Sequence, residues 1–175
     1  MFLIDLIHNA DLPNFTTLFS EINTGMGNGQ IWLVLLLACL IMTLHAMIVL
    51  LIAGMFHWFD QKLENKSVYG ANFLSYFIAI LLIIAVHFTE IIVWTYICVA
   101  LKVFPTNLQT FYFAGEMYTT IGYGIYSLSE QWKILPIIIS FTGIFAVSMS
   151  GAALYSMMVN LLGHSKQSPK SGSGF

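Results

Sequence analysis

The chain has 175 residues, of which 58% are hydrophobic and 8% are charged, and its formal net charge is −2. A soluble domain carries about 25% charged residues, so this composition excludes an ordinary soluble domain and indicates an integral membrane protein. The sequence contains no arginine, which excludes an arginine-rich voltage-sensing helix and argues against a nucleic-acid partner.

The first 30 residues differ from the rest of the chain because acidic residues and glycines interrupt them. Asp5 breaks the opening stretch MFLIDLIH, which also lacks a basic residue, so we expect no cleavable signal peptide. Glycines 25, 27 and 29 predict a hinge before the first long apolar run. We therefore expect residues 1–30 to form an extracytoplasmic segment that lies at the membrane interface.

Three apolar runs follow, and each exceeds the ~20 residues that a helix needs to cross a bilayer core. Residues 31–56 and 134–163 hold no charged residue, and residues 73–101 hold only Glu90. These runs predict an all-α integral membrane protein with three transmembrane helices. The run at 73–101 would be the outer helix of a central unit spanning 73–163, the run at 134–163 its inner helix, and the run at 31–56 an added peripheral helix.

The lysines predict how the chain is oriented. Four of the six flank the cytoplasmic side under the positive-inside rule, in the loop after the first span and in the tail 164–175. The other two lie between the second and third spans. In chain order the lysines are Lys62, Lys66, Lys102, Lys133, Lys166 and Lys170. We expect a prokaryotic plasma membrane protein with its N-terminus outside and its C-terminus in the cytoplasm.

The connection between the second and third spans contains a further apolar stretch. Pro105, Thr106 and Asn107 predict a helix start capped by Thr106 or Asn107, and the helix should cover residues 107–119. At ~18 Å this helix is too short to cross the bilayer, so it must enter part-way and return through TTIGYG at 119–124. Non-helical backbone at this depth must line a water-filled path or be buried in protein. The glycines of TTIGYG permit conformations that align successive carbonyls toward a cation.

TTIGYG resembles the selectivity filter of potassium channels, and the resemblance extends over about residues 105–163 as half-helix, filter and inner helix. It implies K⁺ as the permeant ion. It also implies that Thr119 and Glu116 support the filter from behind. Because one filter strand cannot surround an ion, it further implies a homotetramer. The ion-binding residues implied in this way are Thr120, Ile121, Gly122, Tyr123 and Gly124.

Two positions test the resemblance more closely. In some bacterial members a carboxyl at the place of Glu116 pairs with an aspartate directly after the last filter glycine, where this chain has Ile125. We therefore expect Glu116 to be protonated, or to bond a filter amide or Tyr118. On the inner helix, Gly143 and Gly151 are either hinges or packing glycines. The residues expected to face a central cavity are Ser140, Thr142, Phe145, Met149 and Tyr155.

The first two spans carry ionisable residues near mid-membrane. His87 and Glu90 are three apart and share a helix face, and an antiparallel hairpin places His45 within ~5 Å of His87 in depth. Such groups need partners in a membrane, so we expect the three to lie together in one subunit, off the conduction axis. Three interpretations are open: a structural hydrogen bond assisted by Thr43 or Thr89, a divalent metal site, or a proton-sensitive gate.

The function that the sequence predicts is passive K⁺ conduction, without enzymatic activity, by a homotetramer embedded in membrane lipid. One alternative is a K⁺ transporter subunit built on the same pore unit, although such transporters resemble four fused repeats with degraded filters. The other is an intramembrane metal-dependent hydrolase that uses His45, His87 and Glu90, which leaves TTIGYG unexplained.

Overall fold

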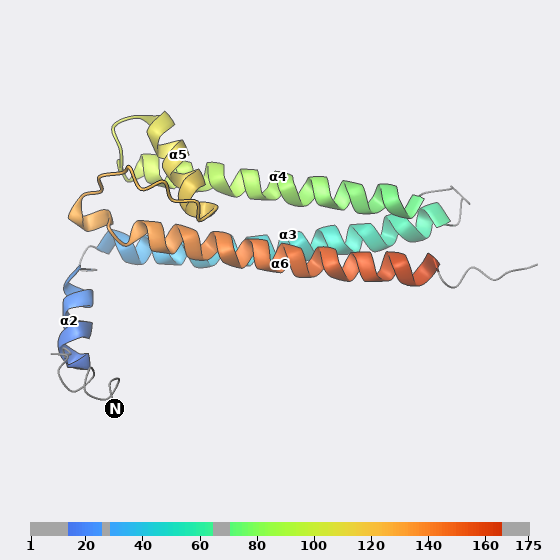
Figure 1. The fold of residues 1–175 in the computed structure, drawn as a ribbon, viewed down its shortest axis with the longest axis horizontal. Helices are drawn as coiled ribbons and strands as arrows, with labels where there is room; N and C mark the ends of the chain where they lie inside the picture. Colours follow the sequence, from blue (N-terminus) through green and yellow to red (C-terminus); the bar gives the residue numbers. More distant parts are fainter. Residues whose placement is uncertain (1–13, 26–28, 65–70, 166–175) are drawn as a thin grey trace, which may run out of the picture.

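The computed structural model describes residues 14–25, 29–64 and 71–165, and within these ranges the regular structure is entirely helical (Figure 1). Three of the helices are long and apolar enough to span a membrane: α3 (Gly29–Glu64), α4 (Ala71–Ala100) and α6 (Leu135–Ser165). The predicted all-α membrane class with three spans is therefore confirmed. The expectations for residues 1–13, for Lys66 and for the tail from residue 166 onward fall outside the described residues.

Helix α3 is longer than the apolar run that predicted it. It begins at Gly29 and continues past Phe56 to Glu64. No proline or glycine occurs between residues 55 and 64, so nothing in the sequence breaks the helix as it leaves the apolar core. Near its end, Lys62 Nζ lies 4.5 Å from the centre of the Trp58 ring, a favourable cation–π contact. The apolar run therefore indicates which part of α3 can lie in the membrane core, but it does not indicate where the helix ends.

Helix α4 ends in a Schellman turn in which a lysine takes the usual place of glycine. Lys102 has a φ of 53°. The N–H of Val103 donates to the carbonyl of Cys98 at 3.1 Å, and the N–H of Lys102 donates to the carbonyl of Val99 at 3.0 Å. These two bonds satisfy the last carbonyls of the helix and reverse the chain toward the half-helix.

The half-helix is α5 (Asn107–Tyr118), which packs against α4 and α6 at one end of the bundle (Figure 1). Thr106 is its cap, since its side-chain oxygen accepts a hydrogen bond from the N–H of Gln109 at 3.3 Å. A short 3-10 turn that the sequence did not predict, η1 (Glu130–Trp132), precedes α6. Helix α2 (Phe15–Gly25) lies at the same end, across the direction of the long helices (Figure 1).

One apolar core joins α3, α4, α5 and α6 at the end of the bundle that carries α5. Its largest fully buried side chains include Val34, Trp94, Phe113, Leu135 and Ile139. A second cluster, around Phe56, Ile83 and Met157, holds α3, α4 and α6 together at the opposite end. Helix α3 therefore packs against both helices of the 73–163 unit rather than against one of them.

Thr142 of α6 points into this core, so the prediction that it faces a central cavity is wrong. Thr142 is only 1% exposed and accepts a hydrogen bond from Trp94 Nε1 at 3.0 Å. Ser140 Oγ donates to the carbonyl of Met117 at 2.8 Å. A buried hydroxyl without a partner is unfavourable, and Thr142 finds its partner on α4 instead of in water. Ser140 is only part-buried, and its position toward a central cavity stays a prediction.

Candidate functional site

The segment 119–124 begins as a turn at Thr119 and Thr120, continues without regular secondary structure, and has a positive φ at every second residue from Thr120. The φ angle is +59° at Thr120, +51° at Gly122 and +74° at Gly124, whereas Ile121 and Tyr123 between them do not have positive φ. Alternation of left- and right-handed residues turns successive N–H groups to one side of the strand and the carbonyls to the other. This alternation favours a row of carbonyl oxygens on one face of the segment, the arrangement that we expected from the sequence.

The start of this segment is fixed to the last turn of α5 by hydrogen bonds. The N–H of Ile121 donates to the carbonyl of Glu116 at 3.0 Å, and the N–H of Thr120 donates to that of Met117 at 3.1 Å. The hydroxyl of Thr119, which we expected behind the filter, donates back to the carbonyl of Gly115 at 2.7 Å. The half-helix therefore sets the direction in which the segment leaves it.

Glu116 holds the N–H side of the segment. Its Oε2 accepts a hydrogen bond from the N–H of Tyr123 at 3.1 Å, and its Oε1 accepts one from the hydroxyl of Tyr126 at 2.8 Å. Of the partners that we expected for Glu116, the structure therefore shows a backbone amide of the segment 119–124, that of Tyr123. Tyr118 is not a partner, because its hydroxyl donates to Glu90 on the other side of α5. Tyr126, which sequence reasoning missed, supplies the second partner that Ile125 cannot.

An aromatic cluster positions Tyr126. Its ring centre lies 5.5 Å from that of Phe104 and 5.3 Å from that of Phe113, and these two rings are 4.9 Å apart. Burial, together with the hydrogen bond to Glu116 and the charge of Glu116, raises the pKa of Tyr126 to about 12. The stabilisation from this contact is therefore fully present below the ordinary tyrosine pKa of about 10 and is lost only as the pH rises through about 12.

Replacing Tyr126 with phenylalanine should destabilise the segment while leaving the aromatic cluster in place. A hydrogen bond to a charged group contributes about 1.5–3 kcal/mol, so we expect ionic current through Tyr126→Phe to decay at least several-fold faster during sustained recording. Tyr96→Phe is the matched control, because the side chain of Tyr96 is exposed on α4. Equal decay rates in wild type and Tyr126→Phe would contradict a role for the hydroxyl.

Helix α6 crosses the end of α5 at Gly143 without room for a side chain. A Cβ atom at this position would lie 1.9 Å from the carbonyl oxygen of Tyr118 and 2.8 Å from its carbonyl carbon. At Gly151 a Cβ would meet nothing within 4 Å. Of the two positions considered as hinges, Gly143 is a site of close backbone packing, and this contact fixes α6 directly behind the start of the 119–124 segment.

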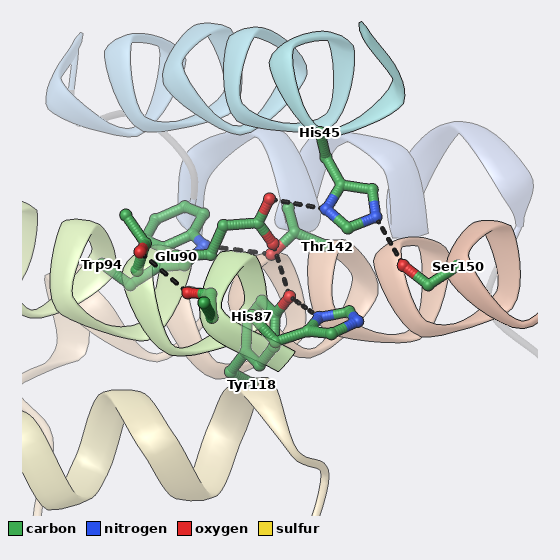
Figure 2. A network of polar contacts seen from close by, with 9 residues as sticks. His45, His87, Glu90, Trp94, Tyr118, Thr142 and Ser150 are labelled. Atoms are coloured by element: carbon green, nitrogen blue, oxygen red, sulfur yellow. Dashed lines mark hydrogen bonds and ion pairs between the residues drawn. The ribbon is translucent and has the colours of Figure 1, made fainter. Parts of the chain in front are cut away.

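The ionisable residues of the first two spans lie together within one chain (Figure 2). His45 Nδ1 is 2.7 Å from Glu90 Oε1. The hydroxyl of Tyr118 donates to Glu90 Oε2 and lies 2.8 Å from His87 Nδ1. His45 Nε2 is 3.1 Å from Ser150 Oγ. This cluster, His45, His87, Glu90 and Tyr118 with Ser150 beside it, draws side chains from α3, α4, α5 and α6.

The threonines expected to assist this cluster do not take part in it. Thr43 Oγ1 donates to the carbonyl of Cys39, and Thr89 Oγ1 donates to the carbonyl of Ala85, both at 2.8 Å. In an apolar helix the nearest acceptor for a threonine hydroxyl is the backbone carbonyl four residues earlier. Tyr118 and Ser150 take the places that we had assigned to Thr43 and Thr89.

Comparison with known proteins shows a family similarity for the central part of the chain. A family model described as ion channel matches residues 77–160, a range that begins within α4, includes α5 and the segment 119–124, and ends within α6. No curated protein and no solved structure matches the chain. The chain is thus a multi-pass membrane protein that carries, over residues 77–160, a region similar to the ion-channel family.

Proposed function

We propose that four copies of this chain form a K⁺-selective channel, with residues 119–124 of each copy lining the conduction path. The observation that carries the proposal is the alternating φ at Thr120, Gly122 and Gly124 together with the Glu116 contact behind them. On this proposal the carbonyls of the segment bind K⁺, the hydroxyl of Thr120 adds a further oxygen, and Gly124 closes the outer mouth.

The direction of α5 supports a cation as the permeant ion. The C-terminal end of a helix carries partial negative charge because the peptide dipoles of the helix are aligned. Helix α5 ends at Tyr118, directly before the segment, and has no basic residue in its last turn. The half-helix therefore aims its negative end at the place where the proposed path begins.

Apolar side chains beside the segment support assembly with further copies. Ile121 is 58% exposed, Tyr123 is 72% exposed and Ile125 is 88% exposed in the single chain. Contiguous apolar side chains next to a water-filled path are unfavourable unless a neighbouring surface covers them. Because one strand also cannot surround an ion, we infer a closed ring of four copies.

The residues of α6 that lie beside the segment 119–124 suggest that a different face of this helix looks toward the proposed axis from the one we expected. Ile144, Val147 and Ser148 lie beside Thr119 and Thr120 and line, with them, a cavity of about 200 Å³. We infer that this face, rather than the face of Phe145 and Met149, looks toward the axis.

We also propose a plasma membrane location with the N-terminus outside. Lys62 lies in the last turn of α3, at the end of the bundle opposite to α5 (Figure 1). Under the positive-inside rule that end is cytoplasmic, so α5 and the segment 119–124 face the outside.

The proposed function is tested with the purified protein in liposomes. A K⁺ gradient should drive flux through the wild-type protein, and an equal Na⁺ gradient should drive little. Native mass measurement of the same preparation should give four copies. Equal Na⁺ and K⁺ flux would refute the selectivity, and an assembly that stops at two copies would refute the ring.

A further inference from the structure

We propose that His45, His87, Glu90 and Tyr118 form a binding site for a divalent transition-metal ion, of which Zn²⁺ fits the donors best. The site joins α3, α4 and α5 within one chain, off the proposed conduction path. It rests on the cluster alone and does not depend on which ion the channel conducts.

The side chains of the cluster supply the donor atoms that a transition-metal ion needs. His45, His87 and Glu90 can each offer one ligand atom such that all three atoms lie within 4.8 Å of one another. Two imidazole nitrogens and one carboxylate suit Zn²⁺, whereas Mg²⁺ and Ca²⁺ prefer oxygen ligands throughout. The Tyr118 hydroxyl lies within hydrogen-bond distance of both Glu90 and His87, and so offers a fourth donor atom.

The orientation of the side chains is the second argument. His45 Nε2 is 3.1 Å from Ser150 Oγ, and Nδ1 faces Glu90 (Figure 2). With a metal ion between Nδ1 and Glu90, Nε2 would carry the proton and donate to Ser150, which leaves the Nδ1 lone pair for the ion. Metal-binding histidines are usually held in this way, with the second ring nitrogen donating to a neighbouring acceptor.

The negative charge of an ionised Glu90 also favours a bound metal ion. Glu90 is only 7% exposed and lies within the apolar span 73–100. No lysine or arginine occurs between residues 73 and 101, so a Glu90 carboxylate has no fixed positive charge within its own span. A buried carboxylate is unfavourable by several kcal/mol unless it is compensated. A divalent cation supplies that compensation.

The cluster also has the space and the access that a metal needs. A tetrahedral ion with bonds of about 2.0–2.1 Å separates its ligand atoms by about 3.3 Å, so His45 Nδ1 and Glu90 Oε1, now 2.7 Å apart, must move apart by roughly half an ångström. A cavity of about 310 Å³ between α3 and α4 reaches His45 and Glu90. Another, of about 330 Å³, reaches His87 and Tyr118 and extends to Thr119.

The test uses the full chain, purified without a polyhistidine tag, stripped with a chelator and titrated with Zn²⁺ alone. We expect one Zn²⁺ per chain and a higher thermal-unfolding midpoint in its presence. Removing a ligand with His87→Gln or Glu90→Gln should lower the affinity more than a hundredfold. Ser150→Ala, which removes only the supporting hydroxyl, should lower it about tenfold. His57→Gln is the matched control, because His57 is an exposed histidine of α3 outside the cluster.

Co²⁺ keeps the proposal testable if a variant does not fold. Wild-type protein with Co²⁺ should show the intense visible absorption of a four-coordinate site, and His87→Cys should add a thiolate charge-transfer band. A folded wild-type protein that binds no Zn²⁺ would overturn the proposal, as would Zn²⁺ binding that His87→Gln and Glu90→Gln leave unchanged. Ion selectivity is measured in metal-free liposomes, so its failure and the failure of the metal site are distinguishable.

Discussion

Gly143→Ala should prevent the chain from folding into a functional channel. The added Cβ would lie 1.9 Å from the carbonyl oxygen of Tyr118, and a backbone atom at the end of a helix cannot rotate away as a side chain can. Inserting a methyl group into a tightly packed site destabilises a protein by about 1–3 kcal/mol and sometimes by more. We expect Gly143→Ala to lower the free energy of unfolding by an amount at or above the top of this range, because α6 must separate from α5 to relieve the contact.

The measurement is the thermal-unfolding midpoint and the yield of the folded assembly, followed by K⁺ flux. Gly151→Ala is the control on the same helix, since nothing lies within 4 Å of a Cβ there. It should unfold close to the wild-type midpoint. A Gly143→Ala protein with wild-type stability and flux would show that the close approach of α6 to Tyr118 is incorrect.

Alanine at Gly122 or Gly124 should abolish selective conduction by a different route. A Cβ at Gly122 would meet nothing within 4 Å, but φ is +51° at Gly122 and +74° at Gly124. An L-residue in this region is unfavourable by about 1–2 kcal/mol, so a ring of four copies would lose roughly 4–8 kcal/mol of preference for the conducting conformation. The segment already holds Thr120 at a φ of 59°, which adds to the strain.

Proteoliposome flux measures this effect, with K⁺ and Na⁺ gradients compared for each variant. We expect Gly122→Ala and Gly124→Ala to assemble like wild type but to lose K⁺ flux or to pass Na⁺ as well. Gly54→Ala, on α3 and without a neighbour within 4 Å of its Cβ, should behave like wild type. If Gly122→Ala kept the wild-type preference for K⁺ over Na⁺, the positive φ at this position would not be needed for selective conduction.

The features that sequence reasoning found depend on length and local periodicity. The three spans follow from apolar runs longer than a bilayer core, and the half-helix follows from a run too short to cross. The meeting of His45 with His87 and Glu90 was expected because His45 and His87 have matched depth in two antiparallel helices and Glu90 shares a face with His87. Backbone geometry at Gly122 and Gly124 was expected because only glycine adopts positive φ readily.

The features that it missed depend on rotation about helix axes and on distant contacts. Helix α6 is apolar on most of its surface, so its sequence does not specify which face meets α4, and Thr142 was placed on the wrong side. Ser150 meets His45 across 105 positions of the chain, and no local pattern relates them. Tyr126 could have been suspected, because it is a phenol two residues after the last filter glycine and within reach of an unpaired Glu116.

The contacts of α3 change the interpretation of the first span. We had treated it as an added peripheral helix, yet His45 is 1% exposed and bonds Glu90 of α4 and Ser150 of α6. Through Glu90 and Tyr118 this contact reaches the residue directly before the segment 119–124. A change at His45 should therefore affect conduction as well as stability, although His45 does not touch the segment.

Reversal potentials test selective K⁺ conduction through residues 119–124. Purified wild-type protein in a planar bilayer would be recorded with K⁺ on one side and an equal concentration of Na⁺ on the other. We expect a reversal potential displaced far from zero toward the K⁺ equilibrium potential, with the displacement lost in Gly122→Ala. A wild-type reversal potential near zero, with measurable current, would contradict it.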